Sequence, residues 1–297
     1  MVVITRKNFT SKFHNDTYPA LQERLKNADL AGKVAFITGS GTGIGAATAL
    51  SLARAGAKAV FLCGRTPSTL EETQQRISKE CPNAIVGKFV FDVSEGLEKA
   101  RQVFTEACKI ADGPLDILMN NAGYIASMPT TPSPSGNWDF EKYWRHFEVN
   151  VKGPLALATA FLEHASERPT LLNISSGAAV IDFVAGLSGY GTSKLAALKM
   201  FSYLYHEQAE RGLKVFHVHP GIVATAMAKE GKSVCDDTAE LAADFLVWLN
   251  APEAAFLQNR FLYVNWDVDE LLAKRETIVA QDLLTPGLRG WDSTSMY

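Results

Sequence analysis

The feature that most constrains the fold of this chain is a regular alternation, from Lys33 onward, of short apolar runs with longer helical segments. Most of the short runs are apolar throughout, which is typical of strands covered on both faces. They lie at 34–38, 59–63, 84–91, 115–119, 170–174, 213–218 and 260–264, and helices are expected at 44–55, 67–79, 97–111 and 188–211. Strands that alternate with helices of this length pair in parallel. The pattern therefore predicts an α/β domain with a single doubly wound parallel sheet and helices on both faces.

Three segments fall outside this alternation. Residues 1–32 are mixed and polar and are interpreted as an N-terminal arm, which leaves 33–267 as the α/β domain. Residues 268–297 begin with a helical stretch at 268–280 and end in a tail, which we assign to the same domain. Residues 128–137 hold three prolines and no apolar period, so we expect an irregular surface loop there.

The composition excludes several classes of function. With 29 Lys+Arg against 32 Asp+Glu, the net charge of −3 offers no basic face for a nucleic acid. No apolar run approaches the about 18 residues of a membrane span, and the N-terminus lacks the pattern of a signal peptide. The four cysteines are scattered and the six histidines never take metal-ligand spacing. We therefore expect a cytoplasmic enzyme with reduced thiols, no metal, and no nucleic-acid or membrane partner.

A glycine-rich turn, from Thr38 to Gly45, follows the first strand and opens an alanine-rich helix. Glycines at such a turn let the backbone approach a pyrophosphate that sits on the N-terminal amides of the helix. The predicted cofactor contacts here are Gly39, Ser40, Thr42, Gly43, Ile44 and Gly45. A loop of purely structural use is the alternative, and the flanking strand and helix make it less favourable.

The end of the second strand predicts which dinucleotide binds. An acidic residue there would favour NAD(H), but this chain has Cys63-Gly64-Arg65-Thr66. The planar guanidinium of Arg65 can clamp a 2′-phosphate, with Thr66 or Ser68 as a further donor. NADP(H) is therefore favoured, and a solvated surface arginine is the alternative.

The next two strands also end in polar residues. Asp92 is placed to accept a hydrogen bond from the adenine amino group, with Val93 donating its amide, and Asn121-Ala122-Gly123 passes beside the ribose. Simple turns are the alternative reading of both sites, because Asp and Asn are common at strand ends.

A tyrosine and a lysine mark the chemical end of the site. Tyr190 and Lys194 are four residues apart in an expected helix, so both side chains project to one side. A nearby cation favours the phenolate and so lowers the pKa of a tyrosine, which can then act as an acid or base on an alcohol/carbonyl pair. Upstream, Ser176 can position the carbonyl oxygen, and Asn150 can hold a water linked to the lysine.

These motifs together resemble the short-chain dehydrogenase/reductase family between about 33 and 267. The family's TGxxxGIG turn matches 38–45, its NNAG matches 120–123, and its catalytic tetrad matches Asn150, Ser176, Tyr190 and Lys194. Its PGxVxT segment, which grips the nicotinamide, matches Pro220, Gly221, Val223 and Thr225. The resemblance implies a Rossmann fold and hydride transfer between NADP(H) and a ketone or secondary alcohol. Tyr190 and Lys194 then also contact the cofactor, Lys194 through the ribose, and helices near 151–167 and 190–211 form a homodimer or homotetramer.

Two departures from the family pattern stand out. The separation between Ser176 and Tyr190 is one residue longer than usual, so we expect a bulge near Gly186 or Gly189. We prefer Ser176 to Ser175 because alternation along the strand points Ser175 to the opposite face. Residues 265–267, Asn-Trp-Asp, replace the usual small glycine-ended turn. That ending, the arm and the tail at 288–291 resemble fungal family members that modify secondary metabolites.

The substrate is expected to be a neutral, apolar ketone or alcohol, such as a secondary-metabolite intermediate. The residues expected to line its pocket are mostly apolar: Tyr124, Ile125, Ala178, Val180 and 224–228. Residues 227–237 are interpreted as a lid over it. Two alternatives remain open: an NADP-binding cyclase or isomerase that uses the same pocket without net redox chemistry, and an NADP-sensing binding protein.

Overall fold

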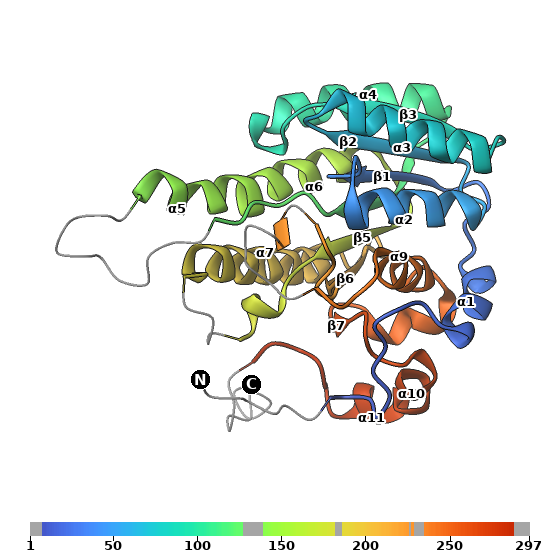
Figure 1. Cartoon of the computed structure of the whole chain (residues 1–297), viewed down its shortest axis with the longest axis vertical. Helices are drawn as coiled ribbons and strands as arrows, with labels where there is room; N and C mark the ends of the chain where they lie inside the picture. The colour runs from blue at the N-terminus through green and yellow to red at the C-terminus, as the bar shows by residue number, and fades with distance from the viewer. Residues whose placement is uncertain (1–7, 127–138, 182–185, 226, 229–234, 288–297) are drawn as a thin grey trace.

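The computed structural model describes residues 8–126, 139–181, 186–225, 227–228 and 235–287. A seven-stranded parallel sheet runs through the molecule in the order β3-β2-β1-β4-β5-β6-β7 (Figure 1). Its strands are β1 (Val34–Thr38), β2 (Ala59–Gly64), β3 (Ile85–Val90), β4 (Leu115–Asn120), β5 (Ala165–Ile174), β6 (Lys214–His219) and β7 (Phe261–Tyr263). This confirms the predicted doubly wound α/β fold.

Helices cover both faces of the sheet because its strands alternate their buried side chains between two cores. Ala35 and Ile37 of β1 join a core with α2, α3 and α9, whereas Val34 and Phe36 join a core with α4, α6 and α7. The helices on the first face are α2 (Gly43–Arg54), α3 (Pro67–Glu80) and α9 (Ala239–Trp248). Those on the second are α4 (Leu97–Ala111), α6 (Gly153–His164) and α7 (Ser188–Glu207).

The observed elements differ from the predicted ones in four places. β5 begins at Ala165 because a bulge, with Arg168 at φ 55°, extends its pairing with β4. β3 lies at one edge of the sheet and is only partly buried, so it is not doubly covered as most strands are. α7 ends at Glu207 instead of continuing to 211. The helix expected at 268–280 is two helices, α10 (Val268–Ala273) and α11 (Arg275–Ala280).

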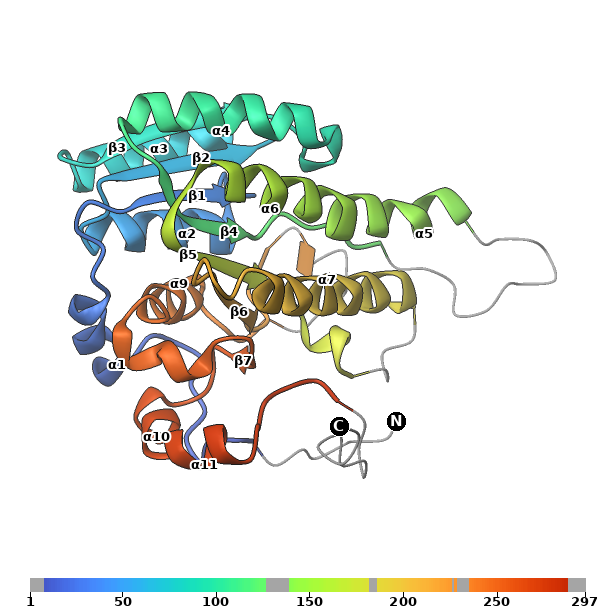
Figure 2. The same ribbon diagram turned by 180° about the vertical axis from the view of Figure 1, so that it is seen from behind.

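One long helical rod reaches beyond the sheet. α5 (Phe140–Phe147) continues through a π-helical turn, η3 (Glu148–Lys152), directly into α6 (Figure 2). α7 packs beside this rod. π-helical turns occur mostly where function requires a local distortion, and this one contains Asn150.

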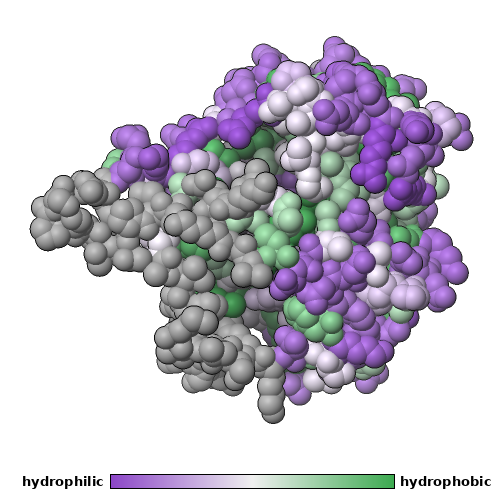
Figure 3. All heavy atoms as spheres, in the orientation of Figure 1, coloured by the Kyte–Doolittle hydropathy of each residue, from purple (hydrophilic) through white to green (hydrophobic). Residues whose placement is uncertain are grey.

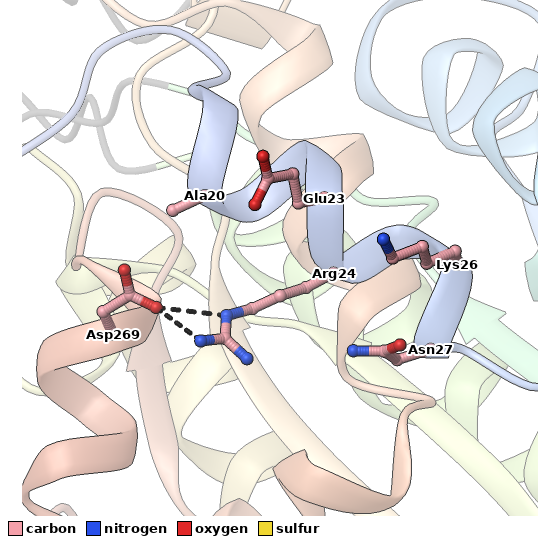
Figure 4. A pocket seen from close by; sticks show the side chains of 6 residues that line it. All are labelled: Ala20, Glu23, Arg24, Lys26, Asn27 and Asp269. Atoms are coloured by element: carbon pink, nitrogen blue, oxygen red, sulfur yellow. Dashed lines mark hydrogen bonds and ion pairs between the residues drawn. The ribbon is translucent and has the colours of Figure 1, made fainter.

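The described part of the arm, residues 8–32, packs along the C-terminal elements. Helix α1 (Pro19–Arg24) is held there by Arg24, whose guanidinium binds the carboxylate of Asp269 in a small pocket (Figure 4). The same guanidinium also binds the carboxylate of Glu253. Glu270 accepts hydrogen bonds from the backbone amides of Ser11 and Lys12. The arm is therefore tied to α10 at two places, residues 11–12 and Arg24.

Four 3₁₀ turns are found in the described residues. They are η1 (Leu25–Asn27), η2 (Val93–Glu95), η4 (Gly177–Ala179) and η5 (Pro252–Leu257). None of the helices in the described residues is long and apolar enough to cross a membrane. Hydrophilic side chains cover the outer helices on the face shown in Figure 3, and apolar ones show between them. The loop at 128–137 and the tail at 288–291 lie outside the described residues.

Candidate active site

The glycine turn lies at the end of β1. β2 and β3 lie on one side of β1 in the sheet and β4 to β7 lie on the other, so the strand order reverses at this point. Parallel sheets bind ligands at such switch points. Gly39 and Gly43 have φ of 65° and 55°, and a Cβ on Gly45 would lie 2.4 Å from the carbonyl oxygen of Gly39. The glycines are therefore required by the turn itself. The turn presents the first amides of α2, which have no partners within the helix, and Ile44 packs on the core.

Ser40, in the glycine turn, is hydrogen-bonded to the two neighbouring strands. Its hydroxyl donates to the carbonyl oxygen of Ile37 at 2.9 Å and accepts from the amide of Cys63 at 2.9 Å. Its own amide donates to the carbonyl oxygen of Cys63 at 3.0 Å. These bonds tie the turn to both β1 and β2, and a contact of Ser40 with the cofactor stays a prediction.

Thr38 joins the glycine turn to the residues after β4. Its hydroxyl accepts hydrogen bonds from the amides of Asn121 and Ala122, at 3.0 and 2.9 Å. The Asn121 amide group donates to the carbonyl oxygens of Thr38 and Gly39, at 2.8 and 3.1 Å. Asn121 thus shapes the turn. The role of Thr38 was missed, although it is the first residue of the glycine motif.

The segment after β6 closes on the same turn. A Cβ on Gly43 would lie 2.8 Å from the Thr225 methyl group, so these two residues are in direct contact. A Cβ on Gly123 would lie 3.2 Å from Met227 Cε and 3.5 Å from Lys194 Nζ. Pro220 and Val223 are buried and Gly221 has φ 79°. The predicted cofactor segments therefore converge on one region at the carboxyl ends of the strands.

Two arginines converge on Asp92 at the other end of this region. Arg145 Nη2 lies 3.2 Å and Arg65 Nη1 3.8 Å from Asp92 Oδ2. Partial burial works to raise the pKa of the Asp92 carboxyl, but hydrogen bonds from Ser94 and the two arginines together hold it below its ordinary value. The Arg65 side chain is 76% exposed, so it has room to move toward a ligand. Sequence reasoning missed Arg145.

The residues next to Arg65 and Asp92 have distinct settings. Thr66 is exposed at the start of α3, with Ser68 exposed in its first turn. Val93 is buried, and its backbone packs against Gly153, where a Cβ would lie 2.9 Å from the Val93 carbonyl oxygen. Thr66 and Ser68 therefore stay available as donors beside Arg65.

Ser176, Tyr190 and Lys194 lie together where β5 ends and α7 begins. Tyr190 is 8% exposed and its phenol is hydrogen-bonded to the Ser176 side chain. Lys194 Nζ lies 5.9 Å from the centre of the Tyr190 ring and donates to the carbonyl oxygen of Ile174 at 2.8 Å. The structure thus brings three members of the predicted tetrad into one cluster, in which Tyr190 and Lys194 are buried and Ser176 is partly buried.

The expected lowering of the Tyr190 pKa is not found. Burial raises the pKa of the Tyr190 phenol above its ordinary value, and the hydrogen bond with Ser176 works only partly against it. Burial also lowers the pKa of Lys194 to about 8. The physical reason is the same for both residues, since a site with little water disfavours each charged form. The prediction considered the attraction between the two charges but not their shared burial.

Asn150 holds the walls of this cluster together. Its side-chain amide donates to the carbonyl oxygen of Tyr124 and to Ser193 Oγ, both at 2.9 Å, and its oxygen accepts from the Tyr124 amide at 2.8 Å. Ser193 Oγ in turn donates to the Tyr190 carbonyl oxygen at 2.8 Å. Both the oxygen and the amide group of the Asn150 side chain are used by these bonds. The water that we expect Asn150 to hold stays a prediction, and its partner would be the backbone carbonyl oxygen of Asn150. Ser193 was missed, since nothing in its spacing marked it.

The two adjacent serines have different surroundings. Ser175 is 3% exposed, and its hydroxyl has no hydrogen-bond partner among the described residues.

The two glycines near which a bulge was expected also differ. Gly186 has φ 86°, whereas a Cβ on Gly189 would lie 2.9 Å from His146 Nδ1. Gly186 therefore has the turn-forming backbone, and Gly189 lets α7 pack on α5.

The predicted substrate residues lie in several segments of the chain. Tyr124 and Ile125 follow the NNAG turn, and the Tyr124 ring meets His146 edge-on with 4.9 Å between ring centres. Val180 is 37% exposed, and Ala178 lies in η4. Next to Ser176, the amide of Gly177 donates to Nδ1 of His219 at 3.2 Å. Residues 226 and 229–234, which include most of the predicted lid, lie outside the described residues.

The described residues contain no group of three His, Cys, Asp or Glu side chains that could hold a metal ion. The donors that they do bring together are backbone amides, hydroxyls and guanidinium groups. Such donors fit the pyrophosphate, ribose and phosphate of a dinucleotide.

Comparisons with known proteins agree with this arrangement. The sequence model of a family described as short chain dehydrogenase matches residues 33–235. The short chain dehydrogenase mpl6 of the fungus Monascus purpureus is 34% identical over 285 residues, which cover 92% of this chain and 94% of the relative. A dehydrogenase/reductase structure from Sinorhizobium meliloti 1021 has a TM-score of 0.70 at 27% identity and covers 82% of this chain and 97% of its own. A blue fluorescent protein from a metagenomic library, solved with NADPH, has a TM-score of 0.70 at 26% identity, covering 80% and 98%.

Proposed function

This chain belongs to the short chain dehydrogenase family, and from that premise we propose that it transfers a hydride between NADP(H) and a neutral, apolar ketone or secondary alcohol. The observation that carries the proposal is the cluster of Ser176, Tyr190 and Lys194. It lies next to Gly123, in the region where Thr225 closes on the glycine turn. An acid/base group thus stands beside the place where the predicted cofactor segments meet.

The chemistry follows from the protonation states of this cluster. When bound, the cofactor supplies or accepts the hydride. During ketone reduction, the Ser176 hydroxyl donates a hydrogen bond to the carbonyl oxygen, and Tyr190 Oη gives its proton to that oxygen. The raised pKa of Tyr190 keeps the phenol protonated at neutral pH, which suits a proton donor. Lys194, with a pKa near 8, supplies positive charge that stabilises the phenolate left behind.

NADP(H) is the proposed cofactor because of Arg65. Its exposed guanidinium stands after β2 with Thr66 and Ser68 beside it, and no acidic residue occupies the second-strand end. A relative solved with NADPH supports the same choice. The fit of the glycine turn and of the α2 amides to a pyrophosphate is common to both dinucleotides, so the choice depends on Arg65.

The substrate class is proposed from the surroundings of the cluster. The predicted lining residues Tyr124, Ile125, Ala178 and Val180 are aromatic or aliphatic. Tyr124 is hydrogen-bonded to Asn150, and the Ala178 amide donates to Ser176 Oγ. A fungal relative is consistent with a substrate from secondary metabolism. A panel of neutral and anionic ketones checks this class, and a preference for acyl-carrier or phosphorylated substrates would contradict it.

The decisive experiment replaces Tyr190. NADPH oxidation is measured with the ketone panel for the native chain, for Tyr190→Phe, and for Tyr205→Phe as a control near the far end of α7, where the ring packs on the core. We expect Tyr190→Phe to lose about 10² to 10⁴ in turnover, the usual contribution of a general acid, and Tyr205→Phe to lose none. Unchanged NADPH oxidation in Tyr190→Phe would contradict the role of Tyr190 as the proton donor. NADPH binding without any NADPH oxidation in the native chain would favour one of the two alternatives, the cyclase or isomerase without net redox chemistry or the binding protein.

A second copy of this chain is the proposed partner. The family resemblance implies contacts through α6 and α7, and both helices expose large apolar side chains: Leu155 at 49%, Leu195 at 44% and Tyr203 at 59%. Leu195 and Tyr203 are eight residues apart and so share one face of α7. We propose a homodimer or homotetramer that covers this face.

A further inference from the structure

A carboxylate outside the catalytic cluster joins three distant parts of the chain. Asp237 Oδ1 accepts hydrogen bonds from the side-chain amides of Asn15 and Asn265, each at 2.7 Å. Asp237 Oδ2 accepts from the backbone amide of Ile222 at 2.6 Å. We call Asn15, Asn265 and Asp237 the arm cluster. It links the N-terminal arm, the end of β7 and the segment that follows β6.

Asp237 fixes the backbone of that segment closely. A Cβ on Gly221, which has φ 79°, would lie 2.6 Å from Asp237 Oδ2, so the carboxylate lies directly against the Gly221 backbone. Val223 forms a parallel bridge with Asp237 itself. Asp237 therefore holds three consecutive residues, and the fold of 220–225 depends on where this carboxylate lies.

The far end of the same segment meets the glycine turn. The Thr225 amide donates to the Val223 carbonyl oxygen at 2.7 Å, and the Thr225 methyl group contacts Gly43. A shift of Val223 is therefore passed through this short turn to Thr225. In this way the position of Asp237 decides how closely the segment approaches the glycine turn.

The arm is held in place by paired contacts with the end of β7. The amide of His14 donates to the Asn265 carbonyl oxygen, and the Asn265 side chain donates to the His14 carbonyl oxygen, both at 2.9 Å. Phe13 forms an antiparallel bridge with Trp266. The backbone amide of Thr238 donates to the Asn15 carbonyl oxygen at 2.9 Å. Asn15 is thus fixed from both sides, with its side chain directed at Asp237.

We propose that Asn15 is a positioning residue, through which the arm sets the distance between 220–225 and the glycine turn by way of Asp237. The arm is then part of the nicotinamide half of the site and not only a cover over α9 and α10. The cofactor role of 220–225 rests on the proposed function. The placement of the segment by Asn15 does not, and it is measured separately.

The test compares two arm residues that each donate to a carboxylate. Asn15→Ala removes the bond to Asp237, and Thr17→Ala removes a 2.6 Å bond to Asp244 on α9. Amide hydrogen exchange of 220–225 is measured without cofactor, and NADPH affinity by fluorescence titration. We expect Asn15→Ala to raise exchange in this segment and the Kd for NADPH about tenfold, since a bond to a charged group is lost. Asn15→Asp places a second carboxylate against Asp237, so exchange in 220–225 and the Kd for NADPH should both rise further than in Asn15→Ala.

Each outcome decides one part of the inference. Thr17→Ala should lower the melting temperature about as much as Asn15→Ala and leave exchange and Kd unchanged. If exchange in 220–225 is the same in Asn15→Ala and the native chain, Asn15 does not position the segment. If exchange rises but the Kd for NADPH stays constant, the segment does not serve the cofactor. A native chain that binds no NADPH overturns the proposed function, while its exchange data still decide the role of Asn15.

Discussion

Ser175 and Ser176 are neighbours in the chain, but only Ser176 takes part in the proposed site. Ser176 shares a hydrogen bond with Tyr190, whereas the buried Ser175 hydroxyl has no partner among the described residues. A buried hydroxyl without a hydrogen-bond partner destabilises the folded state, and removing the hydroxyl relieves this destabilisation. The alternation of side chains along a strand separated the two residues correctly, and burial explains why only one of them can touch a substrate.

Paired substitutions at these serines should give opposite results. We expect Ser176→Ala to lower kcat about 10- to 1,000-fold, since it removes a donor to the carbonyl oxygen. Ser175→Ala should keep native turnover and change the free energy of unfolding by less than about 1 kcal/mol. Steady-state kinetics and urea unfolding of both variants check this. A larger loss of turnover in Ser175→Ala would reverse the assignment.

Arg65 sets the choice of cofactor in our proposal. Its side chain is 76% exposed, and among the described residues it pairs with the Asp92 carboxylate at 3.8 Å, so its replacement should not disturb the fold. Arg65→Ala should raise the Kd for NADPH by about 10- to 100-fold, since charge-assisted hydrogen bonds are lost, and leave the Kd for NADH nearly unchanged. Arg76→Ala, an exposed control on α3, should change neither. Equal losses for both cofactors in Arg65→Ala would show that the 2′-phosphate is recognised elsewhere.

At the scale of elements, a row of buried polar side chains crosses three central strands. Asn120 on β4 donates to Asn173 on β5 at 3.1 Å, and Asn173 lies 3.2 Å from His217 Nδ1 on β6. His217 Nε2 lies 3.2 Å from Asn259 Oδ1. Neutral imidazole satisfies both neighbours, because Nδ1 accepts from an amide and Nε2 donates to an oxygen. The row therefore requires His217 to be neutral.

This row predicts a loss of stability in acid. Burial lowers the pKa of His217 from 6.5 to about 4, so between these values the unfolded chain binds more protons than the folded chain. The free energy of unfolding should therefore fall as the pH drops from 6.5 toward 4, by up to about 1.4 kcal/mol per pH unit from this residue. Urea unfolding at pH 7, 6 and 5 measures the slope. His217→Gln, which cannot titrate, should show a shallower slope, and an equal slope would contradict the prediction.

At the scale of the whole molecule, the exposed apolar face of α6 and α7 predicts self-association. Leu195→Asp should disrupt the proposed interface and reduce the mass measured by light scattering to that of a single chain. Val279→Asp, at an equally exposed apolar position on α11, is the control and should keep the native mass. A native chain that is already monomeric at micromolar concentration would refute the proposed assembly.

Most of the fold was predictable because its signals are local. The strands at 34–38 and 115–119 and the helix at 97–111 were found within a residue of their ends, since buried parallel strands need continuous apolar runs. The start of β5 was missed because a polar bulge at Arg168 carries no apolar pattern. The break between α10 and α11 at Lys274 was missed for a similar reason, since no glycine or proline marks it.

The sequence by itself determined the sheet, the glycine turn and the pairing of Tyr190 with Lys194, because each depends on spacing along a strand or helix. Only the tertiary structure decided how these groups behave. It turned Ser40 inward, placed Arg145 on Asp92, and buried Tyr190 so that its pKa rises instead of falling. It also brought Asn15 to Asp237 across more than two hundred residues of chain. Burial and contacts between distant segments come from packing, and no local pattern in the sequence encodes them.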